Sequence, residues 1–298
     1  MRRHSCRLGV LVCLLGIAFS LLGCSSSCGR SRAPRERGEL TAVEKSTIAA
    51  FTSGTISRES PIRVAFHEPL AKPEQVGAPL SPSPFRFEPQ VAGTAVWAAP
   101  DRIEFRPKDR LPDGQAYAAS LELAPLFPAG QAPPLARFEF VFGTMRQSFD
   151  VGIDGLQAAD ASDVKRQTLT GRLLTADVED APGVEKLLKA THAGRELKVA
   201  WVHDDDRRVH KWSATGIERG EAASVVRVSW DGAPIGVDKK DGQDVSVPGL
   251  DTFTVAEARA VAAPEPHVEL RFTDPLKPGQ NLKGLLRIAE RDDLRFVV

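Results

Sequence analysis

The sequence has no cysteine beyond position 28, because its four cysteines are Cys6, Cys13, Cys24 and Cys28. It contains no Gly-x-Ser-x-Gly elbow, no Walker loop and no Gly-x-Gly-x-x-Gly turn, which are the short motifs of common hydrolase and nucleotide sites. Its 39 basic and 39 acidic residues cancel, so the chain lacks the positive charge typical of nucleic-acid binders. From these absences we expect no nucleic-acid partner, no cofactor and no catalytic activity.

The N-terminus has the layout of an export signal. Three arginines precede an apolar stretch from Leu8 to Leu22, and Gly23 and Cys24 follow it. These 15 residues would span only about 22 Å as a helix, short of a hydrocarbon core of roughly 30 Å. The run Leu-Leu-Gly-Cys resembles a bacterial lipobox. It predicts a signal peptide over 1–23 and lipidation of Cys24; a simple signal peptide without lipidation, or a short anchor, is the alternative.

The lipobox resemblance also implies a location. Ser25, rather than Asp, follows the cysteine. In bacteria with two membranes this favours the outer membrane, facing the periplasm. Residues 24–48 are predicted to be a flexible tether, since 25–44 carry few apolar side chains and cannot offset the entropy cost of ordering. The expected partners are the membrane, through the N-terminal lipid, and proteases or other envelope proteins.

Alternating apolar residues predict an immunoglobulin-like β-sandwich over residues 49–145. Ile62, Val64 and Phe66 share one face of a strand, and four later segments repeat this period of two between turns rich in proline and glycine. Trp97 is expected in the core. Tyr117, the only tyrosine, is expected to anchor a strand through its hydroxyl.

A second β-sandwich is predicted over residues 146–257. Its three tryptophans are expected in the core, and one short helix is expected from Pro182 to near Gly194. The segment Lys239–Gly242 is expected to be a hairpin turn. The strands are expected at Phe149–Ile153, Leu169–Thr175, Leu197–Trp201, Val209–Thr215, Val226–Trp230, Val245–Val247 and Phe253–Val255.

The chain contains an internal repeat. The segments Ile62–Leu70 and Val268–Leu276 both read apolar-x-apolar-x-Phe-x-acid-Pro-Leu, and each follows a nearby proline. The repeat predicts that 258–298 begin a third β domain that does not close. Two interpretations remain: the chain is the N-terminal part of a longer protein, or these residues add strands to an earlier domain.

Several of these segments resemble the N-terminal region of bacterial alpha-2-macroglobulin-like lipoproteins. The resemblance rests on Phe51–Val64, on Trp97 with Arg102–Tyr117, on Leu169–Asp177 and on Trp230–Val237, together with the lipobox. It implies tandem immunoglobulin-like or macroglobulin-type sandwiches and a role in trapping proteases. The thioester of that family needs a Cys-x-Glu-Gln motif, which is missing here, so no trapping residue can be assigned.

Two groups of residues contain side chains of the types that bind metal ions. His67-Glu68 begins like the zinc-protease pattern, but Ala71 stands where the second histidine is required. His203, Asp204, Asp205, Asp206 and His210 form a denser group, which we interpret as a polar hairpin turn. We also interpret Asp160, Asp163, Asp177, Glu179 and Asp180 as solvated surface carboxylates, and therefore expect no metal site.

Two classes of function remain open at this stage. The first is the anchored N-terminal part of an alpha-2-macroglobulin-like defence protein that lacks the bait and thioester regions. The second is a non-enzymatic immunoglobulin-like lipoprotein of the cell envelope that binds a partner or acts as a spacer.

Overall fold

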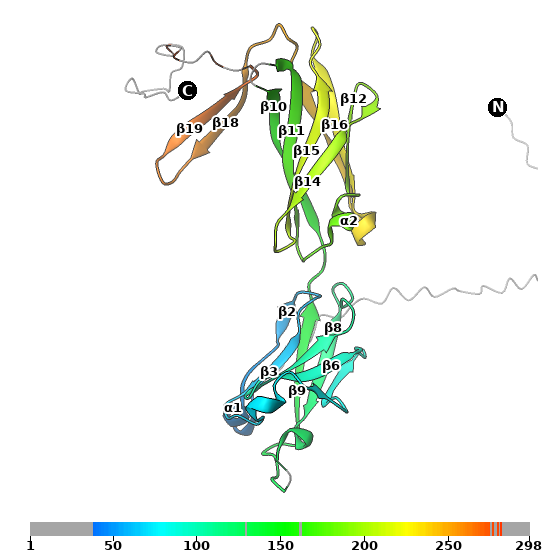
Figure 1. The fold of residues 1–298 in the computed structure, drawn as a ribbon, viewed down its shortest axis with the longest axis vertical. Coiled ribbons are helices and arrows are strands. Elements are labelled where there is room, and N and C mark those ends of the chain that lie inside the picture. Colours follow the sequence, from blue (N-terminus) through cyan, green and yellow to red (C-terminus); the bar gives the residue numbers. More distant parts are fainter. Residues whose placement is uncertain are drawn as a thin grey trace, which may run out of the picture. The chain divides into compact units, whose positions relative to one another are not determined.

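The predicted all-β class is confirmed by a computed structural model of the chain. The structure describes residues 38–128, 130–160 and 163–274, with the isolated positions 276, 279 and 281. Antiparallel sheets dominate this part of the chain (Figure 1). The signal peptide, Cys24 and most of the predicted tether lie outside the described residues.

The first sandwich is built from two facing sheets within residues 48–144. One sheet has the order β1 (Ile48–Phe51), β3 (Ile62–Phe66), β7 (Arg102–Pro107), β6 (Gly93–Ala99) and β4 (Pro79–Leu80). The other has the order β2 (Gly54–Ile56), β9 (Arg137–Thr144), β8 (Ala116–Glu122) and β5 (Phe85–Glu88). Short 3-10 turns lie at Pro73–Gln75 and Ala124–Leu126.

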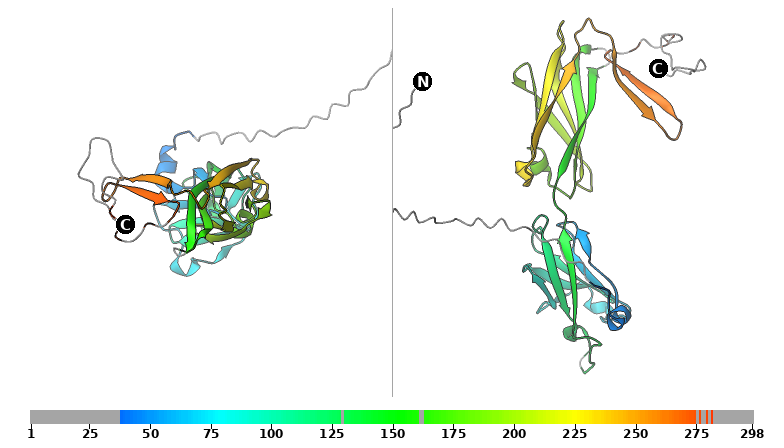
Figure 2. Two further views of the ribbon diagram at one scale, coloured as in Figure 1. Left: turned by 90° about the horizontal axis from the view of Figure 1, so that it is seen from above. Right: turned by 180° about the vertical axis from the view of Figure 1, so that it is seen from behind.

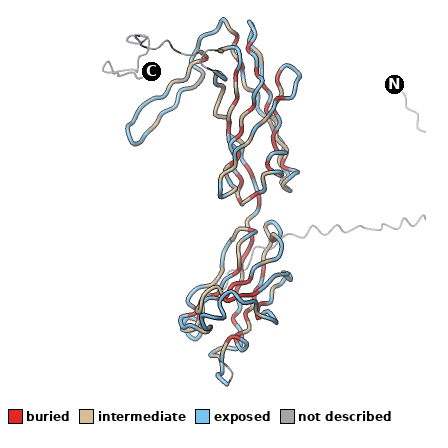
Figure 3. Tube along the Cα trace, viewed as in Figure 1, coloured by how far each residue is buried: buried red, intermediate tan, exposed pale blue. Residues whose placement is uncertain are grey.

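The alternation in the sequence locates the core of this sandwich. Ile62, Val64 and Phe66 are all buried, and so is Trp97, as predicted. Tyr117 is buried as well, and its ring stacks on Phe142 with centroids 5.1 Å apart. Figure 3 shows buried positions recurring along the strands of this sandwich, and burial of their apolar side chains away from water stabilises the fold.

The second sandwich, within residues 149–247, also has two four-stranded sheets. One has the order β10 (Phe149–Asp160), β11 (Asp163–Thr175), β15 (Val209–Glu218) and β14 (Lys198–His203). The other has the order β13 (Arg195–Glu196), β12 (Leu188–His192), β16 (Ser224–Asp231) and β17 (Lys240–Val247). Of the three tryptophans, Trp212 is buried, whereas Trp201 and Trp230 are half-buried against the same core.

Three local predictions in this region are wrong. The helix is only α2 (Ala181–Val184), because Leu188, Ala190 and His192 alternate inward as strand β12 and pair with β16. The segment Lys239–Gly242 is not a turn: β17 begins at Lys240, and the connection from β16 contains a 3-10 turn at Ala233–Ile235. The region around Phe253 does not close the second sandwich.

Instead, β18 (Val255–Val261) pairs with β19 (His267–Phe272) as a separate antiparallel hairpin. Figure 2 shows it as a distinct pair of orange strands. None of the described residues of the hairpin belongs to either sandwich core. Buried Arg219 ties the end of the hairpin to the second sandwich through Asp274 at 2.6 Å and the carbonyl of Gly249 at 2.7 Å.

The end of the predicted tether contains a helix that the sequence interpretation missed. Helix α1 (Ala42–Thr47) begins at a capping box, in which Thr41 accepts from the backbone N–H of Glu44 and Glu44 accepts from that of Thr41. Within the residues that the structure describes, no helix has the length and apolar character needed to cross a bilayer.

Candidate functional site

A buried cluster of charged side chains connects the first sandwich to the second. Arg58, in the turn between β2 and β3, directs Nε to Asp177 Oδ2 at 3.2 Å and Nη2 to Glu179 Oε2 at 3.0 Å. Both carboxylates follow β11 in the second sandwich. All three side chains are at least nine-tenths buried. We use the name junction cluster for these three residues together with the side chains that contact them or their partners, which are Gln147, Arg110 and Glu59.

Further polar contacts complete the junction cluster. Gln147, between β9 and β10, donates to Glu179 Oε2 at 3.0 Å and accepts from the backbone N–H of Asp177 at 3.0 Å. Arg110 contacts Glu179 at 2.6 Å and Glu59 at 2.6 Å. A buried charge is costly unless it is paired and hydrogen-bonded, and here each carboxylate has several partners.

The surroundings favour the ionised carboxylates. Burial alone would raise the pKa of Glu179, but hydrogen bonds from Gln147, Arg58 and Arg110 outweigh it and lower the pKa. Burial likewise opposes the ionisation of Asp177, and hydrogen bonds that include the backbone N–H of Arg58 lower its pKa. The cluster therefore keeps its negative charges at neutral pH.

The interpretation of Asp177 and Glu179 as solvated surface carboxylates is wrong. The sequence carries no local signal of their burial, because Arg58 lies 119 residues before Asp177. Asp160 and Asp180 are exposed, in agreement with the prediction, and Asp163 is half-buried.

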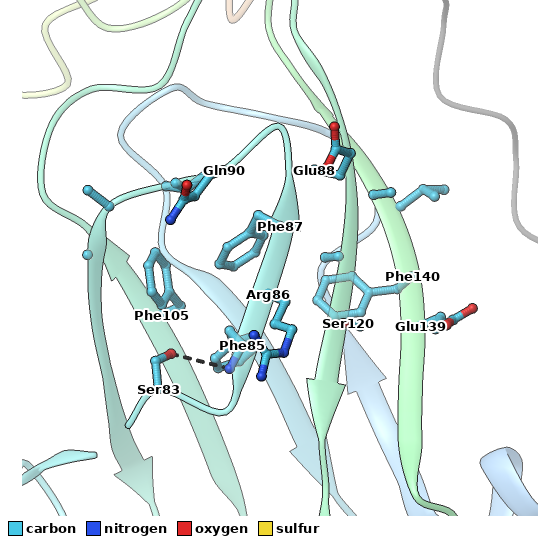
Figure 4. Close-up of a pocket in the computed structure, with 16 residues that line it drawn as sticks. Ser83, Phe85, Arg86, Phe87, Glu88, Gln90, Phe105, Ser120, Glu139 and Phe140 are labelled. Atoms are coloured by element: carbon cyan, nitrogen blue, oxygen red, sulfur yellow. Dashed lines mark hydrogen bonds between the residues drawn. The ribbon is translucent and has the colours of Figure 1, made fainter. Parts of the chain in front are cut away.

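An aromatic groove opens between the two sheets of the first sandwich. Its volume is about 1110 Å³, and four phenylalanines, Phe85, Phe87, Phe105 and Phe140, are among the residues that line it. Figure 4 shows the first three rings gathered together, and the centroids of Phe87 and Phe105 are 4.7 Å apart. The backbone N–H of Phe85 donates to the hydroxyl of Ser83.

The groove also has a free strand edge and a polar rim. Within the residues that the structure describes, strand β5 is the last strand of its sheet, and one side of its backbone has no neighbouring strand there. Arg86, Glu88 and Glu139 supply charge of both signs around the rings. The aromatic rings can contact the apolar body of an extended ligand, and the strand edge and the charged rim can contact its polar groups.

His203 and His210 meet as a cross-strand pair on β14 and β15, with their Nδ1 atoms 2.8 Å apart. His203 Nε2 also lies 3.3 Å from Glu185. His210 is fully buried; burial lowers its pKa, and the neighbouring charge of His203 lowers it further.

The turn predicted at Asp204–Asp206 is confirmed, because Asp204 Oδ1 accepts from the backbone N–H groups of Arg208 and Val209. In the part of the chain that the structure describes, no group of three or more His, Cys, Asp or Glu side chains is arranged to hold a metal ion. His67 contacts a backbone carbonyl, that of Lys45, at 3.1 Å.

No family model and no curated protein matches this chain. Several solved structures show distant similarity. An L,D-transpeptidase from Mycobacterium tuberculosis H37Rv has 15% identity and a TM-score of 0.24, covering 53% of this chain and 65% of its own. An L,D-transpeptidase from Mycobacterium smegmatis has 13% identity and a TM-score of 0.24, covering 76% of each chain. The C-terminal domain of the Streptococcus agalactiae AgI/II polypeptide BspA has 6% identity and a TM-score of 0.19, covering 67% of this chain and 96% of its own.

These comparisons contradict one expectation from the sequence. We expected no catalytic activity, but the similar structures include L,D-transpeptidases, which are enzymes, and we withdraw that expectation. Similarity at this level concerns the fold alone, so it assigns no reaction to this chain.

Proposed function

We propose that this chain is a lipid-anchored cell-envelope protein whose coupled β-sandwiches position a partner or a further module away from the membrane. The junction cluster carries the proposal. Its buried charges keep their full set of partners only while Arg58 and the two carboxylates hold one geometry, and a buried charge that loses a partner is strongly unfavourable. Such a contact restrains motion between the two sandwiches. A protein that holds a partner at a fixed distance from the membrane needs this restraint.

The anchoring part of the proposal rests on Cys24 and has a matched control in the chain itself. Cys24 and Cys28 lie four positions apart, but only Cys24 follows Leu-Leu-Gly. Cells expressing the wild type, Cys24→Ser and Cys28→Ser are labelled with a radioactive fatty acid and fractionated. We expect Cys24→Ser to lose the label and leave the membrane fraction, and Cys28→Ser to keep both. Label retained in Cys24→Ser contradicts the proposal.

The aromatic groove supports a second candidate function, the binding of an extended apolar ligand. A fluorescent fatty acid serves as the probe, and Phe87→Lys places a charge among the three rings. The control is Val202→Lys, at a position whose side chain is 69% exposed in the second sandwich. We expect saturable binding to the wild type and the control, with at least tenfold weaker binding to Phe87→Lys. Equal binding to all three proteins would remove this candidate.

The more specific alpha-2-macroglobulin-like role stays a prediction. Its support is the set of sequence segments that resemble that family and the arrangement of sandwiches in tandem. A role in trapping proteases would require bait and thioester regions that the sequence does not contain.

A further inference from the structure

Strand β5 is the last strand of its sheet in the described part of the chain, and its backbone groups alternate in direction. The N–H of Glu122 on β8 donates to the carbonyl of Pro84 at 2.9 Å. In an antiparallel pair, the N–H and C=O groups that face the neighbouring strand belong to every second residue, so those of Arg86 also face β8. The backbone groups of Phe85 and Phe87 therefore face the open edge of the sheet.

Only a short part of this edge can pair with another strand. The N–H of Phe85 donates to Ser83 Oγ at 3.2 Å, so it is already used. The backbone of Phe87 has no strand beside it on the open side within the described residues. Pro89, the next residue whose backbone would face this side, has no N–H to donate. A strand added here is therefore centred on Phe87.

The side chains of β5 divide between two faces of the sheet. Phe85 and Phe87 lie on the inner face, where their ring centroids are 5.9 and 4.7 Å from that of Phe105. Arg86 and Glu88 alternate with them and are exposed. The open edge thus presents one positive and one negative side chain, two residues apart on the same face.

These charges make the edge complementary to itself. Two copies of β5 pair antiparallel with equivalent faces together only when even-numbered residues lie opposite even-numbered residues. Three registers around Phe87 satisfy this condition. Centring on Arg86 places two arginines opposite one another, and centring on Glu88 does the same with two glutamates, which is unfavourable in both cases. Centring on Phe87 places each Arg86 opposite Glu88 of the second copy, so this register pairs opposite charges at both positions.

We infer that the open edge of β5 pairs with the same edge of a second copy of the chain, antiparallel and about a two-fold axis at Phe87. The two Phe87 residues exchange backbone hydrogen bonds, and their rings lie side by side at the aromatic groove. Two Arg86–Glu88 ion pairs form on the outer face. The formal net charge of the chain is zero, so no overall repulsion opposes the pairing. Such an interface uses the same patch on both copies and closes at a dimer.

The inference uses only residues of the first sandwich and does not depend on the lipid anchor or on the spacer role. The second copy would take the strand edge of the groove for which an extended ligand is the other occupant. The experiments below separate these occupants, because only pairing between copies depends on the concentration of the chain and on charge complementarity between copies.

Charge reversal tests the pairing. Arg86→Glu places glutamates opposite one another, and Glu88→Arg does the same with arginines, whereas an equal mixture of the two variants restores opposite charges at both positions. A single strand pair is a small interface, so the full-length chain is studied in non-ionic detergent by sedimentation equilibrium from about 1 to 500 µM. We expect the wild type to dimerise, each variant alone to dimerise at least tenfold more weakly, and the mixture to recover.

The matched control is Arg227→Glu on β16. Arg86 lies 3.9 Å from Glu122 and is 76% exposed, and Arg227 lies 3.0 Å from Asp244 and is 51% exposed. The control therefore reverses an exposed arginine with a partner in its own sheet, but away from β5, and should dimerise as the wild type does.

Three results of this experiment overturn the inference. A wild type that is monomeric throughout means that the edge receives another ligand or none. A dimer that persists in both variants lies elsewhere on the chain. A mixture that stays as weak as its components means that Arg86 and Glu88 do not lie opposite one another.

Cysteine cross-linking tests the register independently. All four native cysteines are replaced by serine, and Arg86→Cys and Glu88→Cys are introduced into separate chains carrying tags of different size. In the mixed dimer the two cysteines are directly opposite, within reach of a disulfide, while the remaining Arg86 and Glu88 keep their ion pair. In either chain alone the cysteines lie on a diagonal, roughly 7–8 Å apart. After mild oxidation we expect at least tenfold more linked dimer from the mixture. Equal yields from the mixture and from the single chains would overturn the register.

Discussion

Replacing Arg58 by methionine should destabilise the protein far more than the loss of an ordinary surface ion pair. Removing one partner of a buried ion pair costs about 3–5 kcal/mol, because the other charge stays buried. Here the loss is partly compensated. Glu179 keeps Arg110 at 2.6 Å and Gln147 at 3.0 Å. Asp177 keeps the backbone N–H of residue 58 at 2.9 Å. We therefore expect the lower end of the range, about 3 kcal/mol.

The matched control is Arg63→Met. Arg63 also lies 3.0 Å from a buried carboxylate, that of Glu104, but its own side chain is 55% exposed. Exposed pairs contribute about 1 kcal/mol or less. Urea unfolding, followed by circular dichroism and tryptophan fluorescence, measures both variants at pH 7. If Arg58→Met costs no more than Arg63→Met, the account of the junction cluster is refuted.

Three further predictions concern the cores and the dependence on pH. Phe66→Ala should cost about 3–5 kcal/mol in chemical denaturation because the ring is buried, whereas Phe253→Ala, at a side chain 59% exposed, should have little effect; similar losses would refute the burial argument. The pKa of His210 is lowered in the fold by burial and by His203, so its contribution to stability is complete above about pH 6.5 and is lost as the pH falls through the lowered value. The unfolding free energy of His210→Gln should decrease less than that of the wild type between pH 7 and pH 5. An unchanged pH dependence would refute the role of His210. The pKa of Glu179 is also lowered, so its contribution is present above about pH 4.5 and lost in acid; Glu179→Gln should therefore reduce acid sensitivity, as measured by unfolding midpoints from pH 6 to 3.

The period-two pattern was sufficient to predict the strands of the first sandwich. Ile62, Val64 and Phe66 alternate with Arg63 and Ala65, and a strand that is covered on one face requires this pattern. The segment after Pro182 was harder to interpret. Its leucines fit a helical spacing, but Leu188, Ala190 and His192 also fit a strand, and pairing with β16 decides between the two.

The junction cluster could not be predicted from the sequence. Arg58, Gln147 and Asp177 come from turns and linkers far apart in the chain, and only the tertiary fold brings them together. Helix α1, by contrast, has a local signal in the sequence. The sequence from Thr41 to Glu44 has the spacing of a capping box, and both of its hydrogen bonds form.

The central claim is that the junction cluster couples the two sandwiches. Spin labels at Ala118→Cys on β8 and Lys211→Cys on β15, with the native cysteines replaced by serine, report the distance between the sandwiches by double electron–electron resonance. Both positions are exposed. We expect a narrow distance distribution that broadens at least twofold with Arg58→Met and stays narrow with Arg63→Met. A distribution that is equally broad with and without Arg58 would contradict the account.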